Sequence, residues 1–518
     1  MEEYGLGGLA ASAEAVLAGL GPLAAGLARL AVEAGQVVTL EAMELLVAER
    51  GRELLLGVVQ LGVDGQAERE VRLPQVTGAD GVRRARAERG HARTVVTGLG
   101  KVVVRRIGYR SGVRGAGSLF PRDAVLSLPP CGYSWPLQRL AEMFCRSGSY
   151  AQAGEFVLAA TGVRIGGRQL EQIMVAAAAD AERFCRDRDQ AAVPQAGQQE
   201  GEGEGGLLPL VISADGKGVA MRPEARRRRT RAPGKRVRTF TKRAGTGEKK
   251  GHKRMAETGC VFDVLPPEQP RTPEQVMCPG PGRAKDRPRA VNRWYACDIT
   301  AGRDLTIGKI SDEAGRRGPG HARTWIALVD GDNRQIEVIR AEAARRGITI
   351  TIVIDFIHVL EYLWKAAWCF HPPRDPAMEA WVTAQGLDIL HGQVSEVISR
   401  IAQLAEDHPP RPGGEHEKIV RKTLHYLQAK QPWMDYPRAL ANGWPIATGV
   451  IEGACRHLVQ DRMGITGARW GLQGAQAVLW LRALHAGGDL DTYWAWHITQ
   501  EHQRNHLSRF KTDLGLAA

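Results

Sequence analysis

Three segments predicted to be strands are each followed by an aspartate. Each aspartate ends a short apolar run: Asp215 after 207–214, Asp330 after 325–329 and Asp355 after 348–354. Ligands of open α/β sheets bind outside the carboxyl ends of the strands, so carboxylates at these positions can converge on one ion. One such aspartate alone is typical of a helix N-cap or a turn, but recurrence on successive strands favours a shared site.

Carboxylates in this arrangement point to metal chemistry at phosphorus. Their oxygens are hard ligands that suit Mg²⁺ or Mn²⁺. Two such ions about 4 Å apart can activate an attacking oxygen and stabilise a leaving oxygen during in-line displacement. Two acids from neighbouring strands, with a third from a later helix, would therefore support metal-dependent phosphoryl transfer.

The basic charge of the chain is concentrated in one segment. The net charge is +13, and residues 217–254 alone contribute sixteen lysines and arginines against two glutamates, or +14. The rest of the chain is therefore close to neutral. A local charge of this size repels itself unless a polyanion lies against it, so it favours contact with nucleic acid phosphates over a solvated loop.

Hydrophobic periodicity predicts an N-terminal region over 1–185 that is mostly helical. A possible β-hairpin lies at 94–110, around two glycines, and a possible helix-turn-helix lies within 136–180. Both are interpreted as parts that bind DNA ends, although a solvated basic face explains the hairpin equally well. Residues 186–206 are rich in Gln, Glu and Gly and predict a flexible linker.

Residues 207–358 predict the elements of a mixed α/β sheet. Strand-like runs at 207–214, 260–264 and 294–296 are followed by a helix at 303–316, a strand at 325–329, a helix at 333–346 and a strand at 348–354. Five strands interleaved with helices in this order indicate an α/β fold. The remainder of the chain is predicted to be largely helical.

Four short segments taken together resemble bacterial insertion-sequence transposases of the ISKra type, which belong with the Mutator-like DDE enzymes. The segments are VISADGKG at 211–218, LVDGDN at 328–333, DFIH at 355–358 and GVIEG at 449–453. The resemblance covers most of the chain from 207 to 485. It implies a ribonuclease H-like catalytic core with a mixed five-stranded sheet, in which the first strand lies beside the fourth.

The resemblance also implies the site residues. It gives Asp215, Asp330 and Glu452 as the catalytic and metal-binding acids, with a helical insertion at 359–445 and the glutamate carried by C-terminal helices at 446–518. Relatives carry a Cys/Asp-x-x-His mark that Asp355 and His358 fit, so these two are expected to be accessory. The reverse assignment, with Asp355 as the second ligand, remains an alternative, and Asp332 is a lesser one.

Basic residues around the acids are expected to contact DNA. The insert at 217–254 would lie beside the metal site and clamp phosphates on either side of the cleaved bond, and a later Arg- and Gly-rich segment could stack a base or flank the cleavage site. The expected DNA-binding residues are Lys217, Arg226, Arg227, Arg228, Arg229, Arg231, Lys235, Arg236, Arg238, Arg462, Arg469 and Trp470.

The sequence thus predicts a transposase that cleaves and joins DNA with Mg²⁺ or Mn²⁺, using two ions. Its partners would be terminal inverted repeats and target DNA, bound by a homo-oligomer. The start of the chain lacks a basic signal-peptide region and no stretch would span a bilayer, so we expect a cytoplasmic protein. The alternatives are a structure-selective nuclease of the same fold and an inactive DNA-binding relative; a sugar-cleaving enzyme would leave the basic segment without a role.

Overall fold

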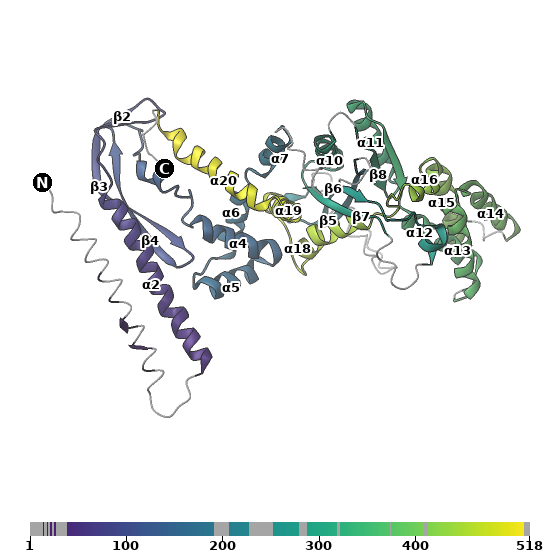
Figure 1. The fold of residues 1–518 in the computed structure, drawn as a ribbon, viewed down its shortest axis with the longest axis horizontal. Helices are drawn as coiled ribbons and strands as arrows, with labels where there is room; N and C mark the ends of the chain where they lie inside the picture. The colour runs from purple at the N-terminus through teal and green to yellow at the C-terminus, as the bar shows by residue number, and fades with distance from the viewer. Residues whose placement is uncertain are drawn as a thin grey trace, which may run out of the picture. The chain divides into compact units, whose positions relative to one another are not determined.

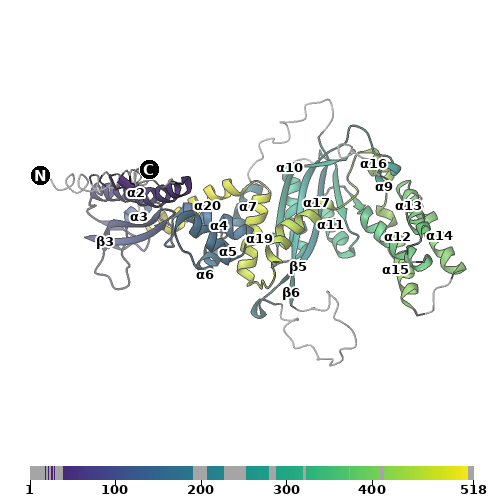
Figure 2. The ribbon, with the colours of Figure 1, turned by 90° about the horizontal axis from the view of Figure 1, so that it is seen from below.

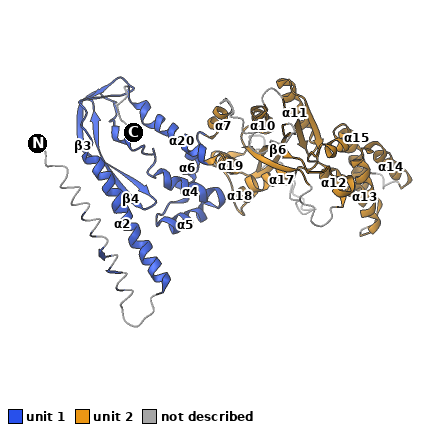
Figure 3. Cartoon of the chain, in the orientation of Figure 1, with its two compact units in different colours: residues 1–180, 491–518 blue, residues 181–490 orange. Residues whose placement is uncertain are grey.

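The computed structural model describes residues 39–190, 207–226, 252–278, 287–318, 322–372, 374–408 and 413–511, with isolated positions between 14 and 29. Figures 1 and 2 show the ribbon from two sides. Most of the predicted basic insert lies outside the described residues, including Arg227, Arg228, Arg229, Arg231, Lys235, Arg236 and Arg238. The chain forms two compact units, residues 1–180 with 491–518 and residues 181–490 (Figure 3).

The first unit combines a long helix, a β-hairpin and a small helical group. Its elements are α2 (Leu40–Glu68), β1 (Val76–Thr77), β2 (Arg83–Arg84), β3 (Arg86–Thr97), β4 (Gly100–Arg110), α3 (Pro121–Val125), α4 (Trp135–Ser147), α5 (Tyr150–Thr161), α6 (Gly167–Ala177), α20 (Leu490–Asn505) and η6 (Leu507–Arg509). The predicted hairpin is present, because β3 and β4 pair antiparallel around a turn that joins Thr97 to Gly100. Gln60 of α2 anchors the hairpin through two hydrogen bonds to the backbone of Val103.

A helix-break-helix is also present where the sequence predicts one. Ser149 caps α5 with its side chain, and α5 ends at Gly162, whose φ of +72° is the left-handed conformation that suits glycine. Gly166 then begins α6. The structure contains helices with a tight break here, and a role in reading DNA stays a prediction.

The end of the chain belongs to the first unit. Asp180 lies 2.8 Å from Nδ1 of His497 and 2.5 Å from a guanidinium nitrogen of Arg504, both on or at the end of α20. Tyr493 donates a hydrogen bond to the backbone carbonyl of Ala177. The sequence-based segment 446–518 is therefore divided, because its described residues from 491 to 511 belong to the first unit.

The second unit is built on a mixed five-stranded sheet of order β7-β6-β5-β8-β9. The strands are β5 (Leu210–Ala220), β6 (Lys253–Leu265), β7 (Arg289–Asp298), β8 (Trp325–Val329) and β9 (Ile350–Ile354). β5, β6 and β7 pair antiparallel, and β5, β8 and β9 pair parallel. The prediction of a mixed α/β fold with a five-stranded mixed sheet is confirmed.

Buried apolar runs explain the central strands. Every residue of β8 is buried, as are Leu210, Val211 and Ile212 of β5, which is the pattern of strands covered on both faces. The sequence interpretation that β5 ends near Asp215 is wrong. β5 continues to Ala220 because β6 pairs with it along its full length, although β8 pairs with it only as far as Ile212.

Helices pack around the sheet, and several of them form a group at one end of the unit. They are α7 (Ala181–Gln190), η1 (Pro223–Ala225), α9 (Pro273–Met277), α10 (Arg303–Arg317), α11 (Asn333–Arg346), α12 (Phe356–Phe370), α13 (Pro376–Leu390), α14 (Val394–Asp407), α15 (Glu415–Lys430), η4 (Gln431–Trp433), α16 (Tyr436–Ala441), α17 (Gly449–Ala454), η5 (Cys455–Gln460), α18 (Asp461–Met463) and α19 (Leu472–Ala486). Within this unit α12, α13, α14 and α15 gather at one end (Figures 1 and 2). They occupy most of the predicted insertion at 359–445.

The predicted linker begins too early. Residues 186–190 are the last turn of α7, and Arg188 holds this turn to the unit through Glu313, at 2.9 Å, and Asp489. Residues 191–206 lie outside the described part of the chain. Among the helices that the structure describes, none has both the length and the apolar character to cross a membrane.

Candidate active site

The register of the parallel strands places three aspartates in one row. Ile212 pairs with Ala327 on β5 and β8, and Val329 pairs with Ile354 on β8 and β9. Continuing the first register by three residues sets Asp215 beside Asp330, and continuing the second by one sets Asp330 beside Asp355. Aligned residues of parallel strands share a face, so the row lies at the carboxyl end of the parallel part of the sheet.

Asp215 is a half-exposed acid with a lysine beside it. Its Oδ1 accepts a hydrogen bond of 2.6 Å from the backbone N–H of Gly216, and its Oδ2 lies 3.4 Å from Nζ of Lys217. Partial burial would lower the pKa of Lys217, but the carboxylate of Asp215 and, more weakly, that of Glu452 raise it above its ordinary value. Lys217 is therefore a firmly charged ammonium at the site.

Asp330 lies directly beyond β8 on a tight turn. Its Oδ1 accepts the backbone N–H of Asp332 at 2.9 Å, and its backbone carbonyl accepts the hydroxyl of Tyr426 at 3.1 Å. Gly331 between them has φ of +95°, which a glycine adopts without strain. Asp332 has a structural role: its side chain caps α11 and forms an ion pair with Arg303.

Asp355 is buried and its carboxylate is densely hydrogen-bonded. It is 0% exposed and accepts from the backbone N–H of Ile357 at 2.7 Å, from both the N–H and the hydroxyl of Thr448, and from Nδ1 of His358 at 3.2 Å. Burial alone would raise the pKa of Asp355, but the hydrogen bonds from His358, Thr448 and Ile357 hold it below the ordinary value. These hydrogen bonds therefore stabilise the negative charge of the buried Asp355 carboxylate.

Thr448 joins this buried acid to Glu452. Its hydroxyl faces Oδ2 of Asp355 and lies 3.1 Å from Oε1 of Glu452, an exposed residue on α17. A hydroxyl has one proton, so it can satisfy only one of the two carboxylates at a time. Two anionic oxygens that share one donor are an environment that a divalent cation would stabilise.

A ligand set for such a cation is present. One oxygen each of Asp355 and Glu452 and one ring nitrogen of His358 lie within 4.8 Å of one another. The hydrogen bond from His358 Nδ1 to Asp355 is the arrangement in which a carboxylate orients a histidine and leaves Nε2 for an ion or a phosphate. The hydrogen bond to Asp355 and the negative charge of that carboxylate raise the pKa of His358.

The two assignments of the second ligand receive different support. Distance favours Asp355, which is in the compact group with Glu452. Availability favours Asp330, which is half exposed, whereas Asp355 already accepts four hydrogen bonds and has no accessible surface. The oxygen-rich donor set of both assignments fits Mg²⁺ or Mn²⁺. The choice stays a prediction, as does the triad itself.

Sequence reasoning missed two residues beside the acids, Glu257 and Arg303. Glu257 on β6 lies opposite Gly216, so that a Cβ on this glycine would be 2.9 Å from its Oε2. Burial raises the pKa of Glu257, the nearby Arg303 opposes this, and Asp215 adds to the rise. No local pattern marks either residue, because the pairing of β5 with β6 brings Glu257 to the site and the position of α10 brings Arg303.

Thr448 was missed as well, although its sequence position carried a signal. It stands immediately before α17 and four residues before Glu452, the place of a helix N-cap. Its side chain turns toward Asp355 and Glu452 instead of capping α17. That direction depends on β9 lying next to the start of α17, which the local sequence does not encode.

Two of the three residues predicted to contact DNA in the segment 462–470, Arg462 and Trp470, are buried. Trp470 is 5% exposed, exchanges backbone hydrogen bonds with Ala220 and Arg222, and packs under the guanidinium of Arg462, which is 2% exposed. Trp470 therefore cannot stack a base of DNA in this conformation, and it joins the later helices to the end of β5. Arg469 remains exposed, and Lys217 and Arg226 are half-exposed.

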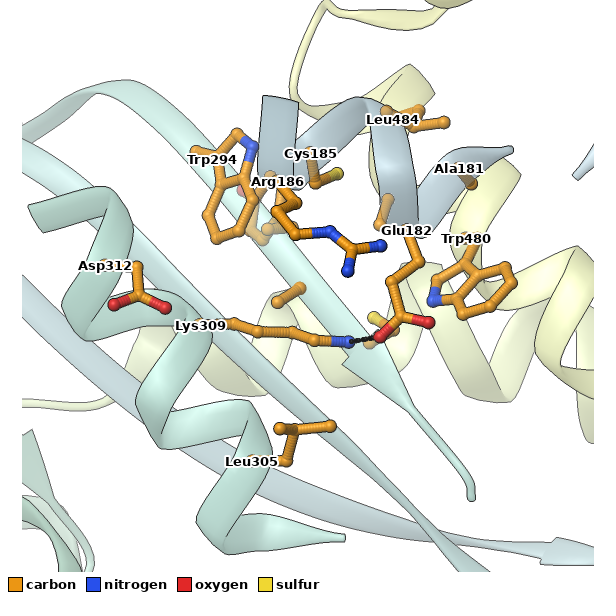
Figure 4. A pocket seen from close by; sticks show the side chains of 14 residues that line it. Ala181, Glu182, Cys185, Arg186, Trp294, Leu305, Lys309, Asp312, Trp480 and Leu484 are labelled. Atoms are coloured by element: carbon orange, nitrogen blue, oxygen red, sulfur yellow. Dashed lines mark ion pairs between the residues drawn. The ribbon is translucent and has the colours of Figure 1, made fainter. Parts of the chain in front are cut away.

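The second unit also contains a cavity over β7, which is separate from the acidic site. A cavity of about 230 Å³ is lined by α7, β7, α10 and α19, with Trp294 and Trp480 among its walls (Figure 4). Lys309 crosses it to pair with Glu182 at 3.5 Å and also pairs with Asp298. Of its other acids, Asp312 pairs with Arg346, and the cavity holds none of the predicted site residues.

Another group of possible metal ligands lies in the first unit, at Asp180, His497 and Glu501. Here Arg504 pairs with both carboxylates and supplies the counter-charge that a cation would bring. This group is explained by its role in holding α20. The acids around Asp330 are therefore the better candidate for metal chemistry.

Comparison with known proteins does not identify the chain. No protein-family model matches it, and no curated protein matches it at a significant level.

Proposed function

We propose that the protein is a metal-dependent DNA transposase of the acidic-triad class with a ribonuclease H-like core. The observation that carries the proposal is the register of β5, β8 and β9, which when continued sets Asp215, Asp330 and Asp355 side by side at the carboxyl end of the parallel part of the sheet; Thr448 joins Glu452 to Asp355. The position of β5 beside β8 agrees with the resemblance, which implies that the first core strand lies beside the fourth.

Asp215, Asp330 and Glu452 would hold the metal, with Asp355 and His358 in support. When bound, one or two Mg²⁺ or Mn²⁺ ions would supply Lewis-acid activation of the attacking and leaving oxygens. In cleavage, a water oxygen attacks phosphorus and the 3′ oxygen departs. In joining, that 3′ hydroxyl attacks a phosphodiester of the target, and the target's own 3′ oxygen departs.

The side chains around the acids have distinct tasks in this scheme. The ammonium of Lys217, beside Asp215, can contact a non-bridging phosphate oxygen. Asp355 holds Nδ1 of His358, so Nε2 is the ring nitrogen that would contact an ion or a phosphate. Tyr426 and the N–H of Asp332 fix the turn that presents Asp330. The basic insert beyond Arg226 supplies further phosphate contacts, largely independent of sequence.

The test is cleavage and joining of labelled DNA that carries the ends of the encoding element, with Mg²⁺, Mn²⁺ or chelator. We expect Asp215→Asn, Asp330→Asn and Glu452→Gln each to abolish products, and Asp355→Asn to weaken them. Asp407→Asn, an exposed acid of α14, is the matched control and should behave as wild type.

Each alternative gives a different pattern in the same assay. If Asp355→Asn abolishes products and Asp330→Asn only weakens them, Asp355 is the second ligand. Cleavage without joined products would identify a nuclease. Binding without any cleavage by the wild type, in every cation, would sink the enzyme proposal.

A further inference from the structure

One face of α15 carries unpaired positive charge. Lys418, Arg421, Lys422 and His425 are all exposed. Lys418 stands three residues before Arg421 and four before Lys422, and His425 follows these two at four and three residues, which places all four on one side of the helix. Among the ion pairs of the described residues, none involves Lys418, Arg421 or Lys422. Like charges at spacings of three and four residues destabilise a helix. Glu415 and Glu417, three residues before Lys418 and four before Arg421, offset part of this repulsion, and an anion against the face would offset more.

This face leads to the acidic row. Tyr426, four residues after Lys422, donates its hydroxyl to the backbone carbonyl of Asp330. Since a helix rises 1.5 Å per residue, Lys422 lies about 6 Å and Lys418 about 12 Å along α15 from that tyrosine. The cations therefore form a path that begins beside Asp330 and runs outward.

Aromatic contacts hold the near end of the path in place. The rings of Tyr362 and Tyr426 stack, with centres 3.9 Å apart and planes 13° apart, which joins α12 to α15. The ammonium groups of Lys422 and Lys365 lie 5.7 Å and 4.9 Å from the centre of the Tyr362 ring. Cations held over a ring lose less freedom when they contact a phosphate.

We propose that Lys418, Arg421 and Lys422, here called the α15 basic face, bind the phosphodiester backbone of the DNA strand that enters the acidic site. The inference rests on the proposed function for its partner. These cations span four residues of α15, or about 6 Å, which corresponds to roughly two phosphates at a rise of about 3.4 Å per nucleotide. Contacts of lysine and arginine to phosphate position DNA without reading its sequence.

The charge pattern explains why the partner is DNA rather than an acidic protein segment. The cations follow one side of α15, and Tyr426, one turn beyond Lys422, contacts the backbone carbonyl of Asp330, a proposed metal ligand. A polyanion with regular spacing, continuous into the site, meets both conditions. Lys365 keeps an ion pair with Glu361 at 3.2 Å, so the strongest contribution is expected from α15 itself.

The experiment uses the full-length protein and a duplex of arbitrary sequence, with the dissociation constant measured over a range of NaCl concentrations. We expect the double variant Arg421→Ala, Lys422→Ala to bind more weakly and to lower the slope of log K against log salt by about 2, since each lost phosphate contact removes about 0.9. Arg340→Ala, Arg345→Ala on α11 removes the same charge from exposed positions and should keep the slope much closer to wild type.

The outcomes separate this inference from the function on which it rests. If wild type cleaves DNA while the α15 variant keeps the wild-type slope, the α15 basic face is overturned and the transposase proposal stands. If the α15 variant lowers the salt dependence of DNA binding while wild type cleaves nothing, the inference about the α15 basic face holds and the enzyme proposal fails. Loss of self-association with an unchanged slope would show an interface between copies and overturn the DNA contact.

In the cleavage assay, the same double variant should raise KM for DNA and leave kcat close to wild type, because α15 contributes no metal ligand. A fall in kcat with unchanged KM would contradict a binding role. Thermal unfolding of both double variants should match wild type, since all four substituted side chains are exposed.

Discussion

Nη1 of Arg303 lies 2.7 Å from Oδ1 of Asp332, and the same side chain reaches Glu257 at 3.5 Å. Asp332 in turn donates its backbone N–H to the carboxylate of Asp330. Arg303, the first residue of α10, therefore ties β6 to the turn that presents a proposed metal ligand. Its role is to position that turn.

We expect Arg303→Ala to raise the Mg²⁺ concentration for half-maximal cleavage by about tenfold, within the range for residues that support metal ligands. Arg303→Lys should recover part of the loss, because an ammonium can still pair with one carboxylate. The measurement is cleavage rate against Mg²⁺ concentration. Arg334→Ala, which removes an exposed ion pair with Asp304, is the control, and an equal shift there would refute the positioning role.

Gly331 should not tolerate a side chain. Its φ is +95°, and a Cβ would lie 2.9 Å from the hydroxyl oxygen of Tyr426. Gly331→Ala is expected to lower the free energy of unfolding by about 1–3 kcal/mol and to reduce cleavage by displacing Asp330. Gly347→Ala also meets a positive φ, of +65°, but has open space around it. This control should cost about 1 kcal/mol in urea unfolding and leave cleavage intact.

Divalent metal should stabilise the protein if the acids bind it. Binding to the folded state alone adds about 2.7 kcal/mol at a metal concentration of 100 times Kd. We expect Mg²⁺ or Mn²⁺ to raise the unfolding temperature of the wild type, and excess chelator to reverse the rise. Asp330→Asn combined with Glu452→Gln should abolish the increment. A full increment in this double variant would place the bound ion elsewhere, with Asp180 and His497 as the next site to substitute.

The first unit should lose stability as pH rises toward 7. Burial raises the pKa of Glu142 from 4.5 to about 7, although Arg146 opposes the rise. The folded state therefore holds a proton that the unfolded state releases, and the stability that this proton contributes is full below pH 4.5 and lost as pH rises through about 7. The contribution is about 3 kcal/mol at most.

Glu142→Gln should flatten this dependence between pH 5 and 8. The measurement is the free energy of urea unfolding of wild type and variant across that range. An unchanged slope in the variant would show that other groups cause it. Asp491→Asn, an exposed acid of the same unit, is the control.

Local sequence was sufficient for the elements that depend on their own composition. The apolar runs of β8 and β9 predict buried strands, and Asp330 and Asp355 follow them as the sequence indicates. The helices at 303–316 and 333–346 were placed within one residue of α10 and α11. Apolar strand runs and amphipathic helices form their backbone hydrogen bonds and bury their apolar side chains in the same way in many folds. Their sequence pattern alone therefore identifies them.

The tertiary structure decided the rest, because strand pairing and burial depend on residues far apart in the chain. Pairing with β6 carries β5 five residues past Asp215 and brings Glu257 beside it. Thr448, at the start of α17, hydrogen-bonds Asp355 at the end of β9, whose carboxylate is buried, a contact that no local pattern predicts. Trp470 is drawn into the fold by backbone bonds to β5. Long-range packing decides which strands pair and which side chains meet, and local periodicity does not contain this information.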